Sequence, residues 1–145
     1  MRALYAYGTL IIPEVLEAVI GRRPHWQIGV LQDYACHRVQ QQVYPAIVER
    51  AGARVSGVVY FALSPEEFTQ LDHYEGDLYE RRSVRVSLGG GELEGVEFEA
   101  DTFVLVDGHH HHLGAEGWDA EEFRRKHLQS YLARMAVTGT APQRD

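Results

Sequence analysis

The sequence predicts an α+β fold in which short strands close into a small mixed β-barrel with flanking helices. Strand-like segments mostly follow one another along the chain, whereas a doubly wound parallel sheet would alternate them with helices. We expect about five to seven short strands, and closing them into a barrel removes their exposed edges. The chain has 145 residues, 45% of them hydrophobic and 24% charged, which suits one soluble globular domain. We expect that domain at residues 1–137 and a polar tail at 138–145.

The first half of the chain is expected to hold one helix among several strands. Pro13 favours a helix start, because the N–H that proline lacks would be unpaired there anyway. Pro45 favours an edge strand, because proline cannot donate a hydrogen bond to a neighbouring strand. The expected elements are a buried strand at 4–6, a helix from 13 to 20, a bent strand at 28–39, an edge strand at 44–48 and a strand at 54–63.

The second half is expected to contain two helices and a hairpin. Ser64 and Glu67 form a capping-box pattern around Pro65, and Gly76 can end that helix in the left-handed conformation. The expected hairpin joins strands at 83–88 and 96–106 through Gly89-Gly90-Gly91, and a last helix begins at the cap Asp119, with Trp118 and Phe123 as its hydrophobic staple.

Charge and cysteine content exclude several classes of function. The formal net charge of −7 makes nucleic acid an unexpected partner, because a nucleic-acid binder usually carries a basic face. Cys36 is the only cysteine, so neither an internal disulfide nor a thiolate metal cluster can form. We find no signal-peptide pattern and no apolar run near the roughly 20 residues of a membrane span, and we expect a cytoplasmic protein without membrane contact. Its oligomeric state is left open between a monomer and a weak dimer.

The turn between the first strand and the first helix is a candidate anion site. It reads Tyr7-Gly8-Thr9-Leu10, and a glycine there lets the backbone approach a ligand closely. The N–H groups of Gly8, Thr9 and Leu10 could then point at an anion near a helix start. The alternative is an ordinary strand-to-helix turn.

Glu75 is a candidate acid/base group. Phe68, Leu71, Asp72 and Glu75 are spaced i, i+3, i+4 and i+7, which places them on one helix face. Desolvation there and the negative end of the helix dipole would both raise the pKa of Glu75, as a general acid and base near neutral pH requires. The alternative is a Glu75 side chain that turns to solvent or pairs with Arg81 or Arg82.

Tyrosines, histidines and the cysteine provide weaker candidates. We expect most tyrosines to be core or half-buried, with one or two hydroxyls in a polar pocket. His109–His112 diverge in an extended loop, which makes a metal-binding module there an unfavoured third alternative. Cys36 is expected to be a core residue. The tyrosines are Tyr5, Tyr7, Tyr34, Tyr44, Tyr60, Tyr74, Tyr79 and Tyr131.

Several short motifs together resemble the gamma-glutamylcyclotransferase-like family, which includes the plant avirulence-induced-gene proteins. The order and spacing of the motifs carry the resemblance, which covers nearly the whole chain. They are Tyr7-Gly8-Thr9-Leu10 with Pro13-Glu14-Val15-Leu16, Tyr44-Pro45-Ala46, Val55-Ser56-Gly57-Val58-Val59-Tyr60, Leu71-Asp72-His73-Tyr74-Glu75-Gly76 with Tyr79-Glu80-Arg81, and Trp118 with Glu121-Glu122-Phe123.

The resemblance implies a small α+β barrel with one cavity and an enzyme that needs no cofactor and no metal. In the family the glycine turn, here residues 7–10, offers N–H groups to a gamma-glutamyl group, and the glutamate that matches Glu75 is the acid/base. Tyr79 matches a tyrosine of the family's pocket. The implied reaction cyclises a gamma-glutamyl amine or amino acid to 5-oxoproline and releases the free amine. The alternative is a small-molecule binding protein that keeps the cavity without turnover.

The segment after the glycine turn bears on the substrate. Residues 10–13 read Leu-Ile-Ile-Pro and lack the tryptophan associated with the glutathione-degrading branch of the family. We therefore expect a gamma-glutamyl substrate other than glutathione.

Overall fold

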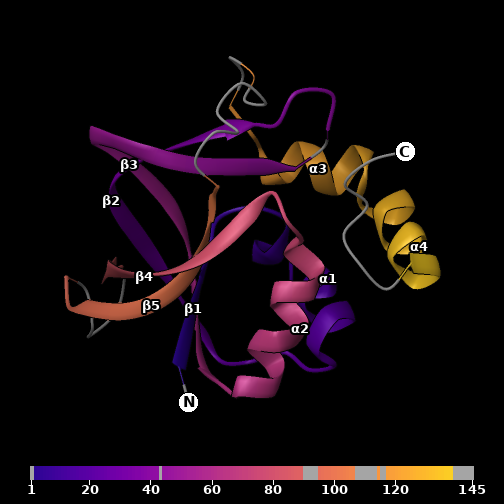
Figure 1. Cartoon of the computed structure of the whole chain (residues 1–145), viewed down its shortest axis with the longest axis horizontal. Coiled ribbons are helices and arrows are strands. Elements are labelled where there is room, and N and C mark those ends of the chain that lie inside the picture. Colours follow the sequence, from indigo (N-terminus) through magenta and orange to yellow (C-terminus); the bar gives the residue numbers. More distant parts are fainter. Residues whose placement is uncertain (1, 43, 90–94, 107–113, 115–116, 139–145) are drawn as a thin grey trace.

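A computed structural model describes residues 2–42, 44–89, 95–106, 114 and 117–138, and its closed barrel with flanking helices confirms the predicted fold class (Figure 1). In that view the strands occupy one side of the molecule and the helices the other. In chain order the elements are β1 (Arg2–Ala6), the 3-10 turn η1 (Thr9–Ile11), α1 (Pro13–Ile20), β2 (Trp26–Arg38), β3 (Pro45–Leu63), α2 (Pro65–Glu75), β4 (Tyr79–Leu88), β5 (Glu97–Leu105), α3 (Ala120–Lys126) and α4 (Leu128–Thr138).

The barrel closes through one parallel contact. Its strand order is β1-β3-β2-β4-β5, and the neighbours within that order pair antiparallel. The ring is completed where β1 and β5 run parallel, with Leu4 opposite Asp101. Thr102 follows Asp101 on β5, and its hydroxyl donates to the Tyr5 carbonyl at 2.8 Å. Closure of this kind gives every strand of the barrel a neighbour on both sides.

The predicted division of the 44–63 region into two strands is wrong. β3 is a single 19-residue strand, and it lies between β1 and β2 rather than at an edge. Pro45 is tolerated because it is the first residue of the strand, opposite Arg38. The bend predicted for the strand at 28–39 coincides with a register jump in the pairing of β2 with β3, since Tyr34 faces Glu49 while Gln32 faces Arg54.

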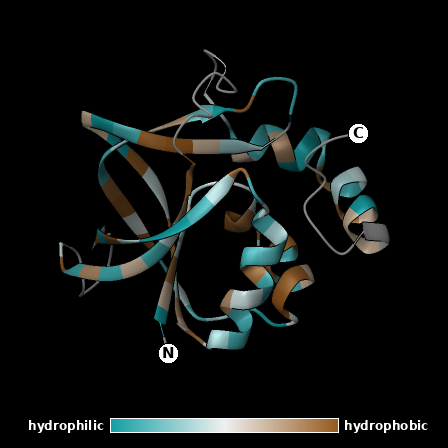
Figure 2. Ribbon diagram, viewed as in Figure 1, coloured by the Kyte–Doolittle hydropathy of each residue, from teal (hydrophilic) through white to brown (hydrophobic). Residues whose placement is uncertain are grey.

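β1 is buried on both faces and separates two cores. Leu4 and Ala6 belong to a cluster that includes residues of all four α-helices, whereas Tyr5 and Tyr7 pack with residues of the other strands inside the barrel. Figure 2 shows hydrophobic residues along α1 and alternating hydrophobic and hydrophilic residues along α2. The chain therefore leaves β1 from the centre of the molecule, where Gly8 begins the turn.

Helix α2 starts as predicted, but its buried face is rotated. The capping box is present, because Ser64 Oγ accepts from Glu67 N–H while the Glu67 carboxylate accepts from Ser64 N–H. Gly76 has the expected positive φ of 76°, but its ψ of −165° lies outside the left-handed helical region. Tyr74 is 2% exposed, whereas Asp72, predicted on the buried face, lies at the surface. The buried face of α2 is therefore formed by Phe68, Leu71 and Tyr74, and it is turned away from Asp72.

The last predicted helix is interrupted in the structure. It is divided at His127 into α3 and α4, and α4 extends through Thr138, which was expected in the tail. The predicted staple is confirmed, with the rings of Trp118 and Phe123 at 5.8 Å between centroids. Residues 139–145 and most of the predicted Gly89-Gly90-Gly91 turn lie outside the described residues. None of the described helices has the length and apolar character needed to cross a bilayer.

Candidate active site

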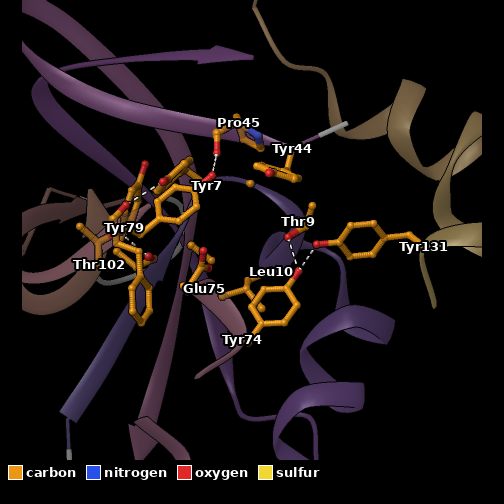
Figure 3. Close-up of a pocket in the computed structure, with 14 residues that line it drawn as sticks. Tyr7, Thr9, Leu10, Tyr44, Pro45, Tyr74, Glu75, Tyr79, Thr102 and Tyr131 are labelled. Carbon is orange, nitrogen blue, oxygen red and sulfur yellow. Dashed lines mark hydrogen bonds between the residues drawn. The ribbon is translucent and has the colours of Figure 1, made fainter. Parts of the chain in front are cut away.

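The structure brings all the sequence-predicted site residues to one pocket (Figure 3). The pocket has a volume of about 30 Å³ and lies where the end of β1, the start of β3, the end of α2 and helix α4 meet. The predicted lining residues are Tyr7, Gly8, Thr9, Leu10, Glu75 and Tyr79; the others are Tyr5, Ala6, Tyr44, Pro45, Tyr74, Thr102, Phe103 and Tyr131. None of these described lining residues is Lys, Arg or His, so the pocket wall carries no cationic side chain from them.

The glycine turn lines the pocket and contains three backbone N–H groups without an acceptor among the described residues. The N–H groups of Ile11 and Ile12 are used, since they donate to the carbonyls of Gly8 and Thr9 at 3.0 and 3.1 Å. Among the described residues, none accepts a hydrogen bond from the N–H groups of Gly8, Thr9 or Leu10. Buried N–H groups normally have a partner, so these three donors need an acceptor from water or from a bound molecule.

The Pro45 ring explains the need for glycine at position 8. A Cβ atom on Gly8 would lie 2.8 Å from Pro45 Cγ, closer than real contacts allow. Pro45 is itself held in place by Tyr79, whose hydroxyl donates to the Pro45 carbonyl at 2.6 Å. Tyr79 therefore supports the turn through Pro45 as well as lining the pocket.

Glu75 has the electrostatic environment of an acid/base group. It lies in the pocket between Tyr7 and Tyr79 on one side and Thr9 and Tyr74 on the other (Figure 3). Part of the residue remains exposed, but burial of its carboxyl, aided by repulsion from Asp72, raises the Glu75 pKa to about 8.

The arginines considered as alternative partners of Glu75 make other contacts. Arg81 lies 3.5 Å from Asp72 and 3.9 Å from Asp101, and its guanidinium packs over the Phe68 ring. Arg82 forms its ion pairs with Glu80 and Glu49. Neither arginine lines the pocket that Glu75 faces.

Tyr7 and Tyr79 give the Glu75 side of the pocket acceptor character. Tyr7 Oη donates to the Phe103 carbonyl at 2.7 Å, and Tyr79 Oη donates to the Pro45 carbonyl. A phenol has one proton to donate, so each oxygen can only accept further hydrogen bonds. The Tyr7 oxygen already accepts one from the Ile47 backbone N–H. Burial, together with the nearby Glu75 carboxyl, raises the pKa of both tyrosines well above the usual range, and they stay neutral.

A chain of three buried hydroxyls lies on the opposite side. Thr9 Oγ1 is 2.7 Å from Tyr74 Oη, which is 2.6 Å from Tyr131 Oη. The three groups come from the glycine turn, α2 and α4, and the dashed lines in Figure 3 trace the chain. Burial raises the pKa of Tyr74 and Tyr131, which keeps both phenols protonated.

Sequence reasoning missed several of the lining residues. It expected one or two tyrosine hydroxyls in the pocket, whereas six of the eight tyrosines line it. Tyr44 and Pro45 stand in a motif that carried the family resemblance, and Tyr74 stands next to Glu75. Tyr131 and Thr102 belong to no such motif.

The remaining candidates lie away from this pocket. His109–His112 fall outside the described residues, among which no group of three or more possible ligands could hold a metal ion. Cys36 packs beside the barrel core, and burial raises the pKa of its thiol to about 12, as expected for an unreactive structural cysteine.

The fold and the site define a class of protein. Its members are small closed α+β barrels with a pocket lined by a glycine turn and one buried carboxyl. A family model described as "Gamma-glutamyl cyclotransferase, AIG2-like" matches residues 4–124. The chain belongs to this family, which confirms the resemblance seen in its motifs. Every site residue predicted from the sequence lies within the matched range.

Relatives and solved structures agree with this assignment. AIG2-like protein D of Arabidopsis thaliana is 30% identical over 132 residues, which cover 91% of this chain and 85% of the relative. A solution structure of another Arabidopsis thaliana protein matches with a TM-score of 0.69 and 26% identity, covering 94% of this chain and 80% of its own. A solved gamma-glutamyl cyclotransferase shares the fold with a TM-score of 0.62 and 20% identity, over 72% of this chain and 66% of its own.

Proposed function

We propose that this protein cyclises a gamma-glutamyl amine or gamma-glutamyl amino acid to 5-oxoproline and releases the free amine, with Glu75 as general acid and base. The observation that carries the proposal is the Glu75 carboxyl, buried in the pocket that the glycine turn lines, with its pKa raised to about 8. A carboxyl with such a pKa can both accept and return a proton near neutral pH.

The reaction needs one proton carrier and one well-positioned substrate. Ionised Glu75 takes a proton from the substrate's α-ammonium group, and the freed amine attacks the γ-carbonyl carbon. The ring closes, the bond to the leaving nitrogen breaks, and Glu75 returns the proton to that nitrogen; the second proton lost by the ring nitrogen leaves with the amine, which departs as an ammonium ion. The attack is intramolecular, so holding the substrate in a folded conformation supplies much of the rate, and the acid/base contributes about 10²–10⁴-fold.

The polarity of the pocket supports a zwitterionic head group. The N–H groups of Gly8, Thr9 and Leu10, which have no acceptor among the described residues, can bind a carboxylate or a developing oxyanion. Glu75 and the hydroxyl oxygen of Tyr79 offer acceptors to the α-ammonium group. The volume of about 30 Å³ is far below the roughly 300–1,000 Å³ typical of drug-sized ligands.

A substrate panel tests the proposal. Purified protein is incubated with gamma-glutamyl amines, gamma-glutamyl amino acids and glutathione, and 5-oxoproline is quantified by mass spectrometry. We expect release from at least one non-glutathione substrate and its loss in Glu75→Gln. Glu66→Gln, at the exposed start of the same helix, is the matched control and should remain active.

Two outcomes would contradict the proposal. Release of 5-oxoproline by Glu75→Gln at the wild-type rate would remove Glu75 from the chemistry. A protein that binds gamma-glutamyl compounds but converts none of them would be a small-molecule binding protein that keeps the family cavity.

A further inference from the structure

Arg81 joins strand β4 to helix α2 beside the pocket. It stands in the motif Tyr79-Glu80-Arg81, but it does not line the pocket itself. Its Nε atom is 3.5 Å from Asp72 Oδ1, and its guanidinium carbon lies 4.9 Å from the centre of the Phe68 ring. A guanidinium at this distance is attracted by the ring as well as by the carboxylate. Both partners of these contacts belong to α2.

The two contacts fall on the stripe of α2 that leads to Glu75. Phe68, Asp72 and Glu75 are spaced i, i+4 and i+7, which makes them successive neighbours along one side of the helix. Arg81 lies against the first two, and Glu75 is the next, in the last turn before Gly76. A side chain that holds Phe68 and Asp72 therefore also restrains the turn that carries the Glu75 carboxyl.

Arg2 leaves the charge of Arg81 available to Asp72. The second carboxylate near Arg81 is Asp101, at 3.9 Å. Arg2 already donates two hydrogen bonds to Asp101, one of 3.1 Å from Nε and one of 2.5 Å from a terminal nitrogen. A bidentate pair of this kind offsets most of the carboxylate charge. The cation of Arg81 is then directed mainly at Asp72, the nearer of its two acidic neighbours.

Asp72 is the neighbour through which a charge on Arg81 reaches Glu75. The groups that face Glu75 from the end of β1, from α2, β4 and α4 are tyrosines, and burial raises the pKa of each, so they are neutral near pH 7. Asp72 repels a negative charge on Glu75 and adds to its raised pKa. A cation beside Asp72 offsets part of that repulsion. The tyrosines are Tyr7, Tyr74, Tyr79 and Tyr131.

We propose that Arg81 is a positioning residue, which holds α2 against β4 through Phe68 and Asp72 and screens the charge of Asp72 from Glu75. This inference rests on the proposed function, because it takes the ionised form of Glu75 to accept the substrate's proton. Without the Arg81 cation, Glu75 keeps its proton to higher pH, and a smaller fraction of the protein is ready to react at neutral pH.

The test removes the charge of Arg81 and measures the ionisation of Glu75. Arg81→Met keeps an apolar chain that can pack on Phe68. Carboxyl ¹³C NMR of the full-length protein follows the titration of Glu75, whose signal is identified by its loss in Glu75→Gln. The pH–rate profile is measured with a substrate from the gamma-glutamyl panel. Both midpoints should rise by about 0.5 pH unit, which lowers turnover at neutral pH about threefold and restores it at higher pH.

Three further variants separate screening from packing. Arg81→Lys keeps the cation and should leave both midpoints within about 0.2 unit of wild type. In an Asp72→Asn background, Arg81→Met should also shift them by no more than about 0.2 unit, because no repulsion remains to be screened. Arg85→Met carries the same change in charge on the same strand, where Arg85 pairs with Glu97 at 3.3 Å, and should have no effect.

The pH profile is the readout that a merely structural Arg81 would not move. Partly exposed ion pairs contribute little to stability, and lost packing lowers the melting temperature without shifting a midpoint. If Arg81→Met is too unstable to titrate, Arg81→Gln gives the same readout with a polar side chain at this partly exposed position.

Each result supports or overturns the inference. Unchanged midpoints in the neutral variants overturn it, as does an equal shift with and without Asp72, since Arg81 would then not act through that carboxylate. Both outcomes leave the proposed function intact. A wild-type protein that converts no gamma-glutamyl compound overturns the proposed function, whereas the NMR midpoints, which need no substrate, still decide whether Arg81 acts on Glu75.

Discussion

The two walls of the pocket differ in the direction of their hydrogen bonds. On the wall formed by Tyr7 and Tyr79, each hydroxyl has given its proton to a backbone carbonyl, so the wall accepts. On the wall formed by residues 8–10, backbone N–H groups have no acceptor among the described residues, so the wall donates. Glu75 lies between them and is the lining residue with a titrating carboxyl.

This contrast shows how a pocket can match a zwitterion without fixed opposite charges. Dipoles of defined direction replace the charged partners, and they avoid the desolvation cost of burying an ion pair. Burial among these neutral groups raises the pKa of the Glu75 carboxyl, and repulsion from Asp72 adds to the increase.

Removing the titrating carboxyl that lies between the two walls should have the largest effect, and it should act on turnover. Glu75→Gln keeps the size of the side chain but cannot carry a proton, so turnover should fall by about 10²-fold or more. Binding of 5-oxoproline, which needs the two walls more than the proton, should change far less. Steady-state rates and NMR titration measure the two effects, and an equal loss in both would indicate a binding role for Glu75.

Disturbing the donor wall should impair binding before chemistry. Gly8→Val places side-chain atoms against the Pro45 ring and should weaken ligand binding by at least about tenfold while most of the fold survives. Gly8→Ala should show a smaller loss, and Pro45→Ala in the same chain should recover part of it by making room. Normal ligand binding by Gly8→Val would mean that the turn is not a binding element.

The pH dependence of stability should report the buried carboxyl. A folded-state pKa of about 8 exceeds the unfolded value of roughly 4.5, so the folded protein holds this proton more tightly. The stability present below pH 4.5 is therefore lost as the pH rises towards 8, by about 1–3 kcal/mol after allowing for relaxation around the charge. Urea unfolding across this range should show the loss in wild type and a smaller one in Glu75→Gln. Parallel curves would contradict the burial of the carboxyl.

A smaller effect is expected from the charge one turn before Glu75. Asp72→Asn removes the repulsion that contributes to the raised Glu75 pKa, so that pKa should fall by less than about one unit. The rate should increase with pH as Glu75 ionises, and this rise should move to lower pH in Asp72→Asn. Glu66→Gln carries the same change in charge at the other end of α2 and should leave the profile in place.

The smallest effect is expected from the histidine run. Replacing His109–His112 with serine should leave the melting temperature and 5-oxoproline release within about twofold of wild type, because four adjacent histidines make a poor closed metal site. Loss of activity in this variant, together with zinc-dependent activity of the native protein, would show that the run contributes to the site.

Local chemistry made part of the site predictable from the sequence. Glu75 could be placed at the end of its helix because Ser64, Glu67 and Gly76 mark both helix ends by short-range rules. The glycine turn could be placed because a buried strand and a helix-starting proline flank it. Such signals act within a few residues, so they can be recognised without knowledge of the tertiary structure.

Strand pairing and the hydroxyl chain could not be predicted in this way. Whether residues 45–63 form one strand or two depends on their pairing with β1 and β2. The contact between Tyr74 and Tyr131 joins residues 57 positions apart, and no local pattern marks either as a partner. Even the rotation of α2 was missed, because the packing of Tyr74 against α4 outweighs the spacing of its apolar residues.

The parallel closure between β1 and β5 has a consequence for the order of folding. Leu4 pairs opposite Asp101, so the ring cannot close until chain segments nearly a hundred residues apart have met. Non-local pairing of this kind is slow, because loop-closure entropy is lost before contacts compensate for it. The pocket also needs Tyr131, and a growing chain has no complete site until that residue has left the ribosome. The site is therefore completed in a late step of assembly. During refolding, the recovery of 5-oxoproline binding should lag behind the recovery of helical circular dichroism.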